Sequence, residues 1–257
     1  MLVSVLLTSY NRIGFVATAI ESVLTSTYRD FEFIICDDCS TDGTYELEQQ
    51  YAAKDSRIKL FRNEVNLGDF PNRDNAASYA SGTYLKYVDS DDFIHPDGLK
   101  KMVESMLKFP DAMIGLSQVE TELNKEKEYP VLISPESVYQ EHFYGYGTLR
   151  YGPTGAILKK EVLTEMGGFG TNRFVGDTEL WLKIVAKYPL VKMEPNLVEW
   201  IRHEGQEFDY GMRNDIYIRK AYQVYVASML SPNGSSLSIL NITKKKATFS
   251  SGFFYKN

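Results

Sequence analysis

The sequence contains few of the residues that build disulfide frameworks or histidine-rich metal sites. Its 257 residues include 2 cysteines and 3 histidines, which excludes a disulfide-stapled domain. Cys36 and Cys39 have the C-x-x-C spacing of a redox pair, but Cys39 falls in a polar loop after a strand-like run, whereas a redox pair would open a helix. A zinc site would need two further ligands, and His95, His142 and His203 are widely scattered. We therefore interpret the cysteines as one core thiol and one loop thiol.

Long apolar runs and an excess of positive charge are also missing. No apolar run approaches the ~20 residues that span a bilayer, and only Met1 precedes the first strand-like run, which leaves no room for a signal peptide. The formal net charge of -6 gives no basic field to attract nucleic acid. We expect a cytoplasmic protein with no nucleic-acid partner, attached at most peripherally to the inner face of a membrane.

What is present in the first half is a regular alternation of short apolar runs and helical patterns. Strands are predicted at Val3–Thr8, Phe31–Cys36, Arg57–Arg62 and Tyr84–Val88. The intervening helices are predicted at Ile13–Thr25, Asp42–Ala53 with Asp42 as N-cap, Pro71–Tyr79, and Pro96–Phe109 with proline in the first turn. This alternation indicates an α/β protein with a mostly parallel sheet.

The second half has a looser pattern. A strand is predicted at Ala112–Ser117, whereas residues 120–152 show little periodicity and are typical of variable, substrate-facing segments. Further helices are predicted at Lys160–Met166, Asp177–Lys187 and Phe208–Met229, with one or two strands between Leu190 and Ile201.

Polar clusters follow three of the predicted strands, where an open parallel sheet binds its ligands. They are Thr8-Ser9-Tyr10-Asn11, Asp37-Asp38-Cys39-Ser40 and Asp89-Ser90-Asp91-Asp92. No strand is followed by G-x-G-x-x-G or by a P-loop, which removes the dinucleotide and Walker signatures. Adjacent carboxylates favour Mg²⁺ or Mn²⁺, whose coordination shell a diphosphate would complete. The alternative is an acidic turn that caps the helix near Pro96.

These clusters carry a resemblance to a known family. The runs Val3–Arg12, Asp37–Asp42, Asn66-Leu67-Gly68 and Gly82–Asp92 together resemble the GT-A fold, family 2 glycosyltransferases, in order and spacing. The resemblance continues through Gly167-Gly168-Phe169 and Gly176–Lys183 to about Gly205. It implies a Rossmann-like, mostly parallel central sheet flanked by helices. We expect this domain to span residues 1–205, with a nucleotide-binding half (1–110) and an acceptor half (111–205), and to be followed by a C-terminal helical extension (206–257).

The resemblance also implies contacts to a pyrimidine nucleotide sugar. Thr8 and Tyr10 would line the base, and Asp38 would accept a hydrogen bond from the pyrimidine N3–H. Arg73 would steady the nucleotide or the acidic cluster, although Asp74 replaces the usual Asn after it. The expected donor is a UDP- or dTDP-sugar.

In the acidic cluster, the resemblance implies that Asp89, with Ser90, approaches the nucleotide sugar and that Asp91 ligates Mn²⁺ or Mg²⁺. His203 would reach the metal or the diphosphate, although a lone histidine is more often structural.

The catalytic base implied by the resemblance is Asp177, which would deprotonate the acceptor hydroxyl in an inverting displacement. The usual Glu before it is missing, and Glu179 is the alternative base. Asp177 could instead be only a first-turn acid of its helix. No Q-x-x-R-W motif occurs, so we expect a hexosyltransferase that moves one sugar to a glycan or lipid-linked glycan, as in bacterial surface polysaccharide assembly.

Two other functions stay open at this point. The altered residues beside Arg73 and Asp177 allow a catalytically inactive nucleotide-sugar binder. A phosphohydrolase with a D-x-D nucleophile is the weaker alternative, because that motif normally follows the first strand and here it follows the fourth. The tail 232–257 combines Lys244-Lys245-Lys246 with aromatic residues and could contact an anionic membrane, although a solvated segment is the simpler interpretation.

Overall fold

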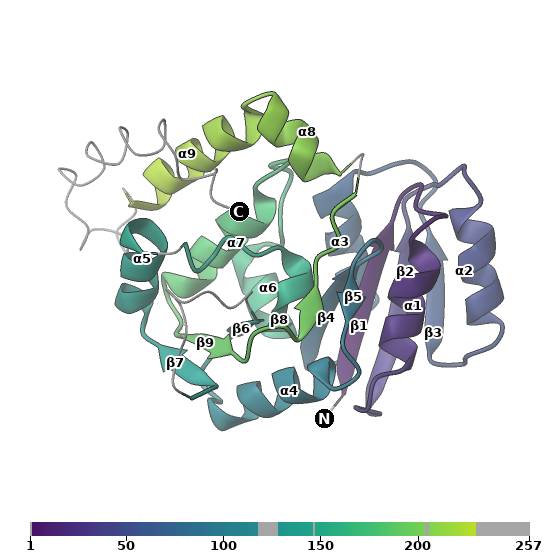
Figure 1. Cartoon of the computed structure of the whole chain (residues 1–257), viewed down its shortest axis with the longest axis horizontal. Helices are drawn as coiled ribbons and strands as arrows, with labels where there is room; N and C mark the ends of the chain where they lie inside the picture. Colours follow the sequence, from purple (N-terminus) through teal and green to yellow (C-terminus); the bar gives the residue numbers. More distant parts are fainter. Residues whose placement is uncertain (1, 118–127, 146, 204–205, 230–257) are drawn as a thin grey trace.

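An eight-stranded sheet runs through the molecule in the order β3-β2-β1-β4-β8-β6-β9-β7 (Figure 1). The computed structural model describes residues 2–117, 128–145, 147–203 and 206–229. The strands of this sheet are β1 (Val3–Ser9), β2 (Phe31–Asp37), β3 (Ile58–Arg62), β4 (Tyr84–Asp89), β6 (Ile114–Ser117), β7 (Val131–Ile133), β8 (Ala156–Lys159) and β9 (Leu190–Met193), and β5 (Phe93–Ile94) pairs with β10 (Val198–Glu199) apart from it.

The helices lie on the two faces of this sheet. They are α1 (Val16–Leu24), α2 (Thr44–Ala52), α3 (Asp69–Ser78), α4 (Gly98–Lys108), α5 (Pro135–Tyr144), α6 (Lys160–Met166), α7 (Gly176–Val185), α8 (Glu207–Arg213) and α9 (Ile216–Met229), with a 3₁₀ turn at Pro153–Gly155. Side chains of α1, α2 and α4 pack against one face, and those of α3, α5, α6, α7 and α9 against the other.

The first four strands form a continuous parallel ribbon. β1 pairs with both β2 and β4 in parallel, and β2 pairs with β3 in the same sense. All seven residues of β1 and of β2 are buried, which is why their sequences are mostly apolar and do not alternate between apolar and exposed polar residues. Because β1 lies between β2 and β4, the chain reverses its direction of progress there, and the carboxyl ends of β1 and β4 border a topological switch point.

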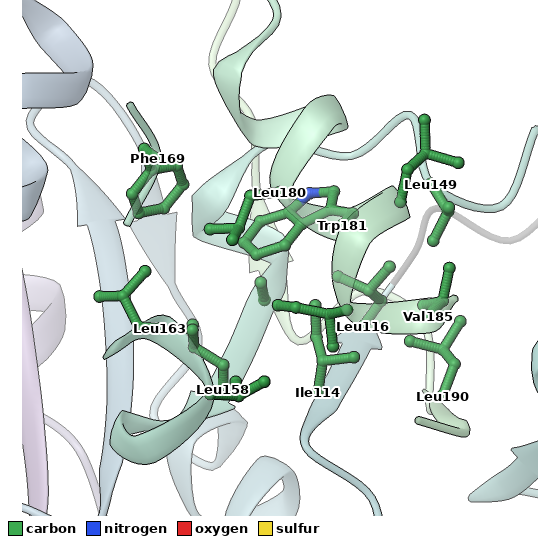
Figure 2. Packing of buried hydrophobic residues seen from close by; sticks show 14 of the residues in the cluster. Ile114, Leu116, Leu149, Leu158, Leu163, Phe169, Leu180, Trp181, Val185 and Leu190 are labelled. Atoms are coloured by element: carbon green, nitrogen blue, oxygen red, sulfur yellow. The ribbon is translucent and has the colours of Figure 1, made fainter. Parts of the chain in front are cut away.

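The second half of the sheet is shorter and mixed. β8 is antiparallel to both β4 and β6, whereas β6 and β9 are parallel. Helix α7 covers this half of the sheet with Trp181, the largest fully buried side chain among the described residues. Trp181 belongs to the same buried cluster as Phe169, Leu180 and Leu158 (Figure 2). The sequence prediction of a mostly parallel sheet flanked by helices is confirmed, but strands β7 and β8 were not predicted.

Several predicted helices differ in detail from the structure. The predicted helix at 208–229 is two helices, because the chain breaks at Asn214-Asp215, where Asp215 has φ of 56°. Pro96 lies two residues before α4 rather than in its first turn. Gly43, not Asp42, is the N-cap of α2, although the Asp42 carboxylate accepts a hydrogen bond from the Thr44 amide at 3.0 Å.

The C-terminal helices are attached to the rest of the fold. α9 packs against α7, and its Ala221, Val224 and Tyr225 belong to the same buried cluster as Trp181. The tail 232–257, for which the sequence left membrane contact as the alternative to a solvated segment, lies outside the described residues. Within the residues that the structure describes, no helix is both long and apolar enough to cross a bilayer.

Candidate active site

A cavity of about 860 Å³ opens at the carboxyl ends of β1, β2 and β4. Every predicted site residue except His203 lines it: Thr8, Tyr10, Asp38, Arg73, Asp89, Ser90, Asp91 and Asp177. Thr8 is opposite Cys36 of β2 and Asp89 of β4 in the sheet register, so the strand pairing itself brings these ends together. The Tyr10 ring is 46% exposed and therefore accessible to a planar ligand.

Asp38 is buried directly after β2, at one end of the cavity, and fixes the turn opposite it. Its Oδ1 accepts hydrogen bonds from Asn63 Nδ2 at 2.7 Å and from the Leu67 amide at 2.8 Å, and its Oδ2 accepts from the Gly68 amide at 2.9 Å. These three hydrogen bonds fix the orientation of the Asp38 carboxylate and tie the 66–68 turn to it. Each carboxylate oxygen has more than one acceptor site, so Asp38 retains capacity for a ligand N–H.

Arg73 bridges two carboxylates in the middle of the cavity. Its Nη1 donates to Asp89 Oδ1 at 2.6 Å and its Nε donates to Asp69 Oδ1 at 2.9 Å. The side chain is 7% exposed, and the neighbouring anions keep the guanidinium charged although burial opposes its charge. The arrangement supports the predicted role of Arg73 in steadying the acidic cluster, and Asp69 is an additional acid that the sequence did not reveal.

Asp91 and His203 meet although they are far apart in the chain. His203 Nε2 lies 2.9 Å from Asp91 Oδ2, and the Arg12 Nε lies 3.2 Å from the same oxygen. The His203 ring stacks on Phe15, with ring centroids 4.2 Å apart. The structure therefore places His203 beside Asp91, although the His203 side chain itself does not line the cavity.

The donor set at Asp91 fits a hard divalent cation with an incomplete protein shell. Among the described residues, no group of three or more His, Cys, Asp or Glu side chains is arranged to hold a metal. One carboxylate and one imidazole leave most positions to water and phosphate oxygens, which is how Mg²⁺ and Mn²⁺ bind with phosphorylated substrates.

Asp177 lies in the first turn of α7 and faces the other side of the cavity. Burial raises its pKa to about 6, while the Thr178 amide, which donates to Asp177 Oδ1 at 2.6 Å, and nearby Arg73 oppose this shift. A carboxylate with such a pKa is ionised at neutral pH yet basic enough to accept a proton. Glu179 instead accepts from Asn172 Nδ2 at 3.1 Å and pairs with Lys183 Nζ at 2.8 Å.

Asp74, at the position where the resembling family has Asn, links the two halves of the site. Its carboxylate oxygens accept from the Phe169 amide at 2.9 Å and from the Gly170 amide at 3.3 Å. Gly168 has φ of +79°, and a Cβ there would lie 2.6 Å from both Asp74 oxygens. The close approach and the positive φ both favour glycine at 168, while Gly167, with φ of +81°, is the left-handed C-cap that ends α6.

A buried acid pair, Glu48 and Asp37, lies at the carboxyl ends of β1 and β2. Glu48 Oε1 accepts from Ser9 Oγ at 2.6 Å, while Glu48 Oε2 and Asp37 Oδ2 have no hydrogen-bond partner in the part of the chain that the structure describes. Burial raises the pKa of Glu48 to about 8, and the charges of Asp37 and Asp42 add to this effect while Arg62 opposes it. Glu48 is therefore mostly protonated at neutral pH.

Sequence reasoning missed several residues that line the cavity away from the carboxyl ends of β1, β2 and β4. They are Asp69, Arg150, Tyr151, Arg173, Phe174, Trp200, Glu207, Phe208 and Tyr217. Trp200 stands three residues before His203, which was a usable signal, whereas no local pattern distinguishes Tyr217 from the other tyrosines.

Comparison with known proteins gives matches over the whole fold. A family model described as glycosyl transferase family 2 matches residues 4–167. Over 107 residues the chain is 39% identical to the Escherichia coli UDP-Glc:alpha-D-GlcNAc-diphosphoundecaprenol beta-1,3-glucosyltransferase WfgD, an alignment that covers 42% of each protein. A glycosyltransferase of Rickettsia felis is 33% identical over 94% of this chain and 36% of its own length. The chain thus matches less than half of the length of these curated relatives.

Among solved structures, S. aureus TarS 1–349 in complex with UDP-GlcNAc superposes with a TM-score of 0.72 at 19% identity, over 97% of this chain and 72% of that chain. The mannosyltransferase PcManGT of Pyrobaculum calidifontis, in complex with GDP-Man and Mn²⁺, gives 0.63 at 17% identity, over 98% and 81%. At such identities the likeness shows the fold, which is the GT-A arrangement.

Proposed function

Because the chain belongs to glycosyl transferase family 2, we propose that it moves one sugar from a UDP- or dTDP-sugar to a hydroxyl of a glycan or lipid-linked glycan acceptor. The transfer inverts the anomeric configuration and requires Mn²⁺ or Mg²⁺. The observation that carries this proposal is that one cavity contains the polar ends of β1, β2 and β4 and, across from them, the carboxylate of Asp177. The lipid-linked acceptor in the name of the E. coli relative supports a role in surface polysaccharide assembly.

The nucleotide end offers contacts of the right chemistry for a pyrimidine. Tyr10 presents a ring for stacking, Thr8 lies at the strand end beside it, and Asp38 presents a fixed carboxylate to an N–H group. Asp89 and Ser90 then lie toward the ribose, with Arg73 holding Asp89 in place. When bound at Asp91 and His203, a divalent cation would offset the charge of the diphosphate as it leaves.

The reaction itself needs one base. The acceptor hydroxyl attacks the anomeric carbon as its proton passes to a carboxylate oxygen of Asp177, and the bond from carbon to the diphosphate oxygen breaks. A single displacement of this kind inverts the anomeric configuration. Glu179, held by Lys183 and Asn172, does not line the cavity, so we assign the base to Asp177.

Donor binding is the experiment that tests this function. In a thermal-shift panel of UDP-, dTDP-, GDP- and CMP-sugars with Mn²⁺, a UDP- or dTDP-sugar should stabilise the protein, by ~2.7 kcal/mol when present at ~100 times its dissociation constant. Asp91→Asn should weaken the binding by roughly 10- to 100-fold, and EDTA should have the same effect on the unmodified chain.

Asp97→Asn is the matched control, because Asp97 is an exposed acid of the same segment that does not line the cavity. Pyrimidine-sugar binding that withstands EDTA would contradict the metal assignment. Stabilisation by GDP-sugars alone would contradict the assignment of a pyrimidine nucleotide.

A further inference from the structure

The wall of the cavity opposite the nucleotide end is aromatic. Phe174, Trp200, Phe208 and Tyr217 all line the cavity, and we call them the aromatic wall. They come from four separate places: the loop before α7, the segment after β10, helix α8 and helix α9. Trp200 is 47% exposed, although large aromatic side chains are usually covered in a folded protein.

The rings support one another edge to face. Trp200 and Phe208 have centroids 5.5 Å apart at 89°, and Phe208 and Tyr217 have centroids 5.3 Å apart at 70°. Such contacts fix the ring planes, so the wall is a preorganised surface rather than a set of independent side chains.

Phe174 is held in the wall against its backbone preference. Its φ is 77°, a conformation that is unfavourable for a bulky residue, and it lies three residues before Asp177. The ring stacks on Tyr210 and receives Arg173 and Lys220 as cation–π partners. Strain of this kind persists where the surrounding structure over-determines it, and it concentrates at ligand sites.

Planar polar groups border the same wall. Arg173 and Glu207 form an ion pair, and both line the cavity. Gln206 is 6% exposed and also lines the cavity, and its Oε1 has no hydrogen-bond partner within the described residues. Guanidinium, carboxylate and amide groups match the donors and acceptors of neighbouring hydroxyls.

From this combination we propose that the aromatic wall binds the acceptor through the apolar face of a pyranose ring, with the polar border contacting the ring hydroxyls and one hydroxyl placed at Asp177. A pyranose presents polarised C–H groups on its face and hydroxyls at its edge, which complements an electron-rich ring surface bordered by polar groups. The assignment rests on the proposed function, because a sugar transferase needs an acceptor on the side of the cavity that the nucleotide does not occupy.

The two tryptophans allow a direct test on the full chain. Trp181 is fully buried and Trp200 is half exposed, so acrylamide quenching of tryptophan fluorescence reports on Trp200. With UDP and Mn²⁺ present, methyl glycosides of glucose, galactose, mannose and N-acetylglucosamine are titrated, and the open-chain polyol sorbitol is the matched control. At least one methyl pyranoside should protect Trp200 from quenching, whereas sorbitol, which has hydroxyls but no ring face, should not.

Phe208→Leu keeps an apolar side chain but removes a ring, and it should weaken pyranoside binding roughly tenfold while UDP binding stays unchanged. Tyr79→Leu is the control variant, because Tyr79 is 41% exposed and does not line the cavity. Failure of every pyranoside to protect Trp200, equal protection by sorbitol, or unchanged affinity in Phe208→Leu overturns the inference. UDP binding in the same samples separates this outcome from failure of the proposed function, in which UDP itself would not bind.

Discussion

The two sides of the cavity, which we propose to be a donor side and an acceptor side, are built by different means. Thr8, Asp38 and Asp89 occupy strand ends whose relative positions follow from the parallel register of β1, β2 and β4. Asp177, Trp200 and Tyr217 instead come from a helix start, a loop and a late helix, and no strand pairing relates them. The comparison teaches that the donor side depends on the sheet interior, whereas the acceptor side depends on side-chain packing among segments distant in sequence.

The largest expected effect tests the chemistry on the acceptor side. Asp177→Asn preserves shape but cannot accept a proton, so turnover should fall ~10²- to 10⁴-fold while donor affinity stays nearly unchanged. In the unmodified enzyme, turnover should rise with pH through about 6, because burial raises the pKa of Asp177 and the base must be ionised. Initial rates of sugar transfer across pH, with donor binding measured in parallel, check both expectations.

Glu179→Gln is the control for that experiment, since Glu179 pairs with Lys183 outside the cavity. Loss of activity in the control but not in Asp177→Asn would move the base to Glu179. A product that retained the donor configuration would rule out the single displacement.

The next effect tests how far the donor side depends on the sheet interior. Burial raises the folded-state pKa of Glu48 to about 8, above the ~4.3 of an unfolded chain, so the stability that comes from its protonation is complete below pH ~4 and is lost as pH rises through 8. Glu48→Gln mimics the protonated form and should gain stability over the unmodified protein with rising pH, by on the order of a few kcal/mol at pH ~9.

Urea denaturation at several pH values measures this difference. Glu46→Gln, an exposed change on the same helix, should not alter the pH dependence. A pH-independent gap between Glu48→Gln and the unmodified protein would show that the buried pair does not titrate as inferred.

The smallest expected effect concerns the strained residue of the acceptor side. Phe174→Gly and Phe174→Ala both remove the ring, but only glycine is relaxed at φ of 77°. The glycine variant should therefore be more stable than the alanine variant by ~1–2 kcal/mol, measured by chemical denaturation. Equal stabilities would indicate that the backbone at 174 relaxes once the ring is gone.

The same division explains what could be predicted from the sequence. The four parallel strands and the polar clusters after them follow from mostly apolar runs and their endings, so the strand ends that border the cavity can be located from the order of residues alone. The antiparallel strand β8, the break at Asp215 and the contribution of Tyr217 could not be predicted, because they depend on contacts such as that of α9 with α7, which have no local periodicity. His203 was placed by resemblance alone, and the stacking on Phe15 that holds it beside Asp91 has no sequence signature.

The close approach of Asp74 to Gly168 ties the two halves together. A side chain at 168 would collide with the Asp74 carboxylate, and a shorter side chain at 74 would leave the amides of Phe169 and Gly170 without their acceptor. The same carboxylate makes both contacts, so the losses of stability caused by substitutions at 74 and at 168 should not be additive. Asp74 directly follows Arg73, and the 167–170 loop leads into α7, which carries Asp177. The contact between Asp74 and this loop therefore links the backbone positions of the two proposed functional residues.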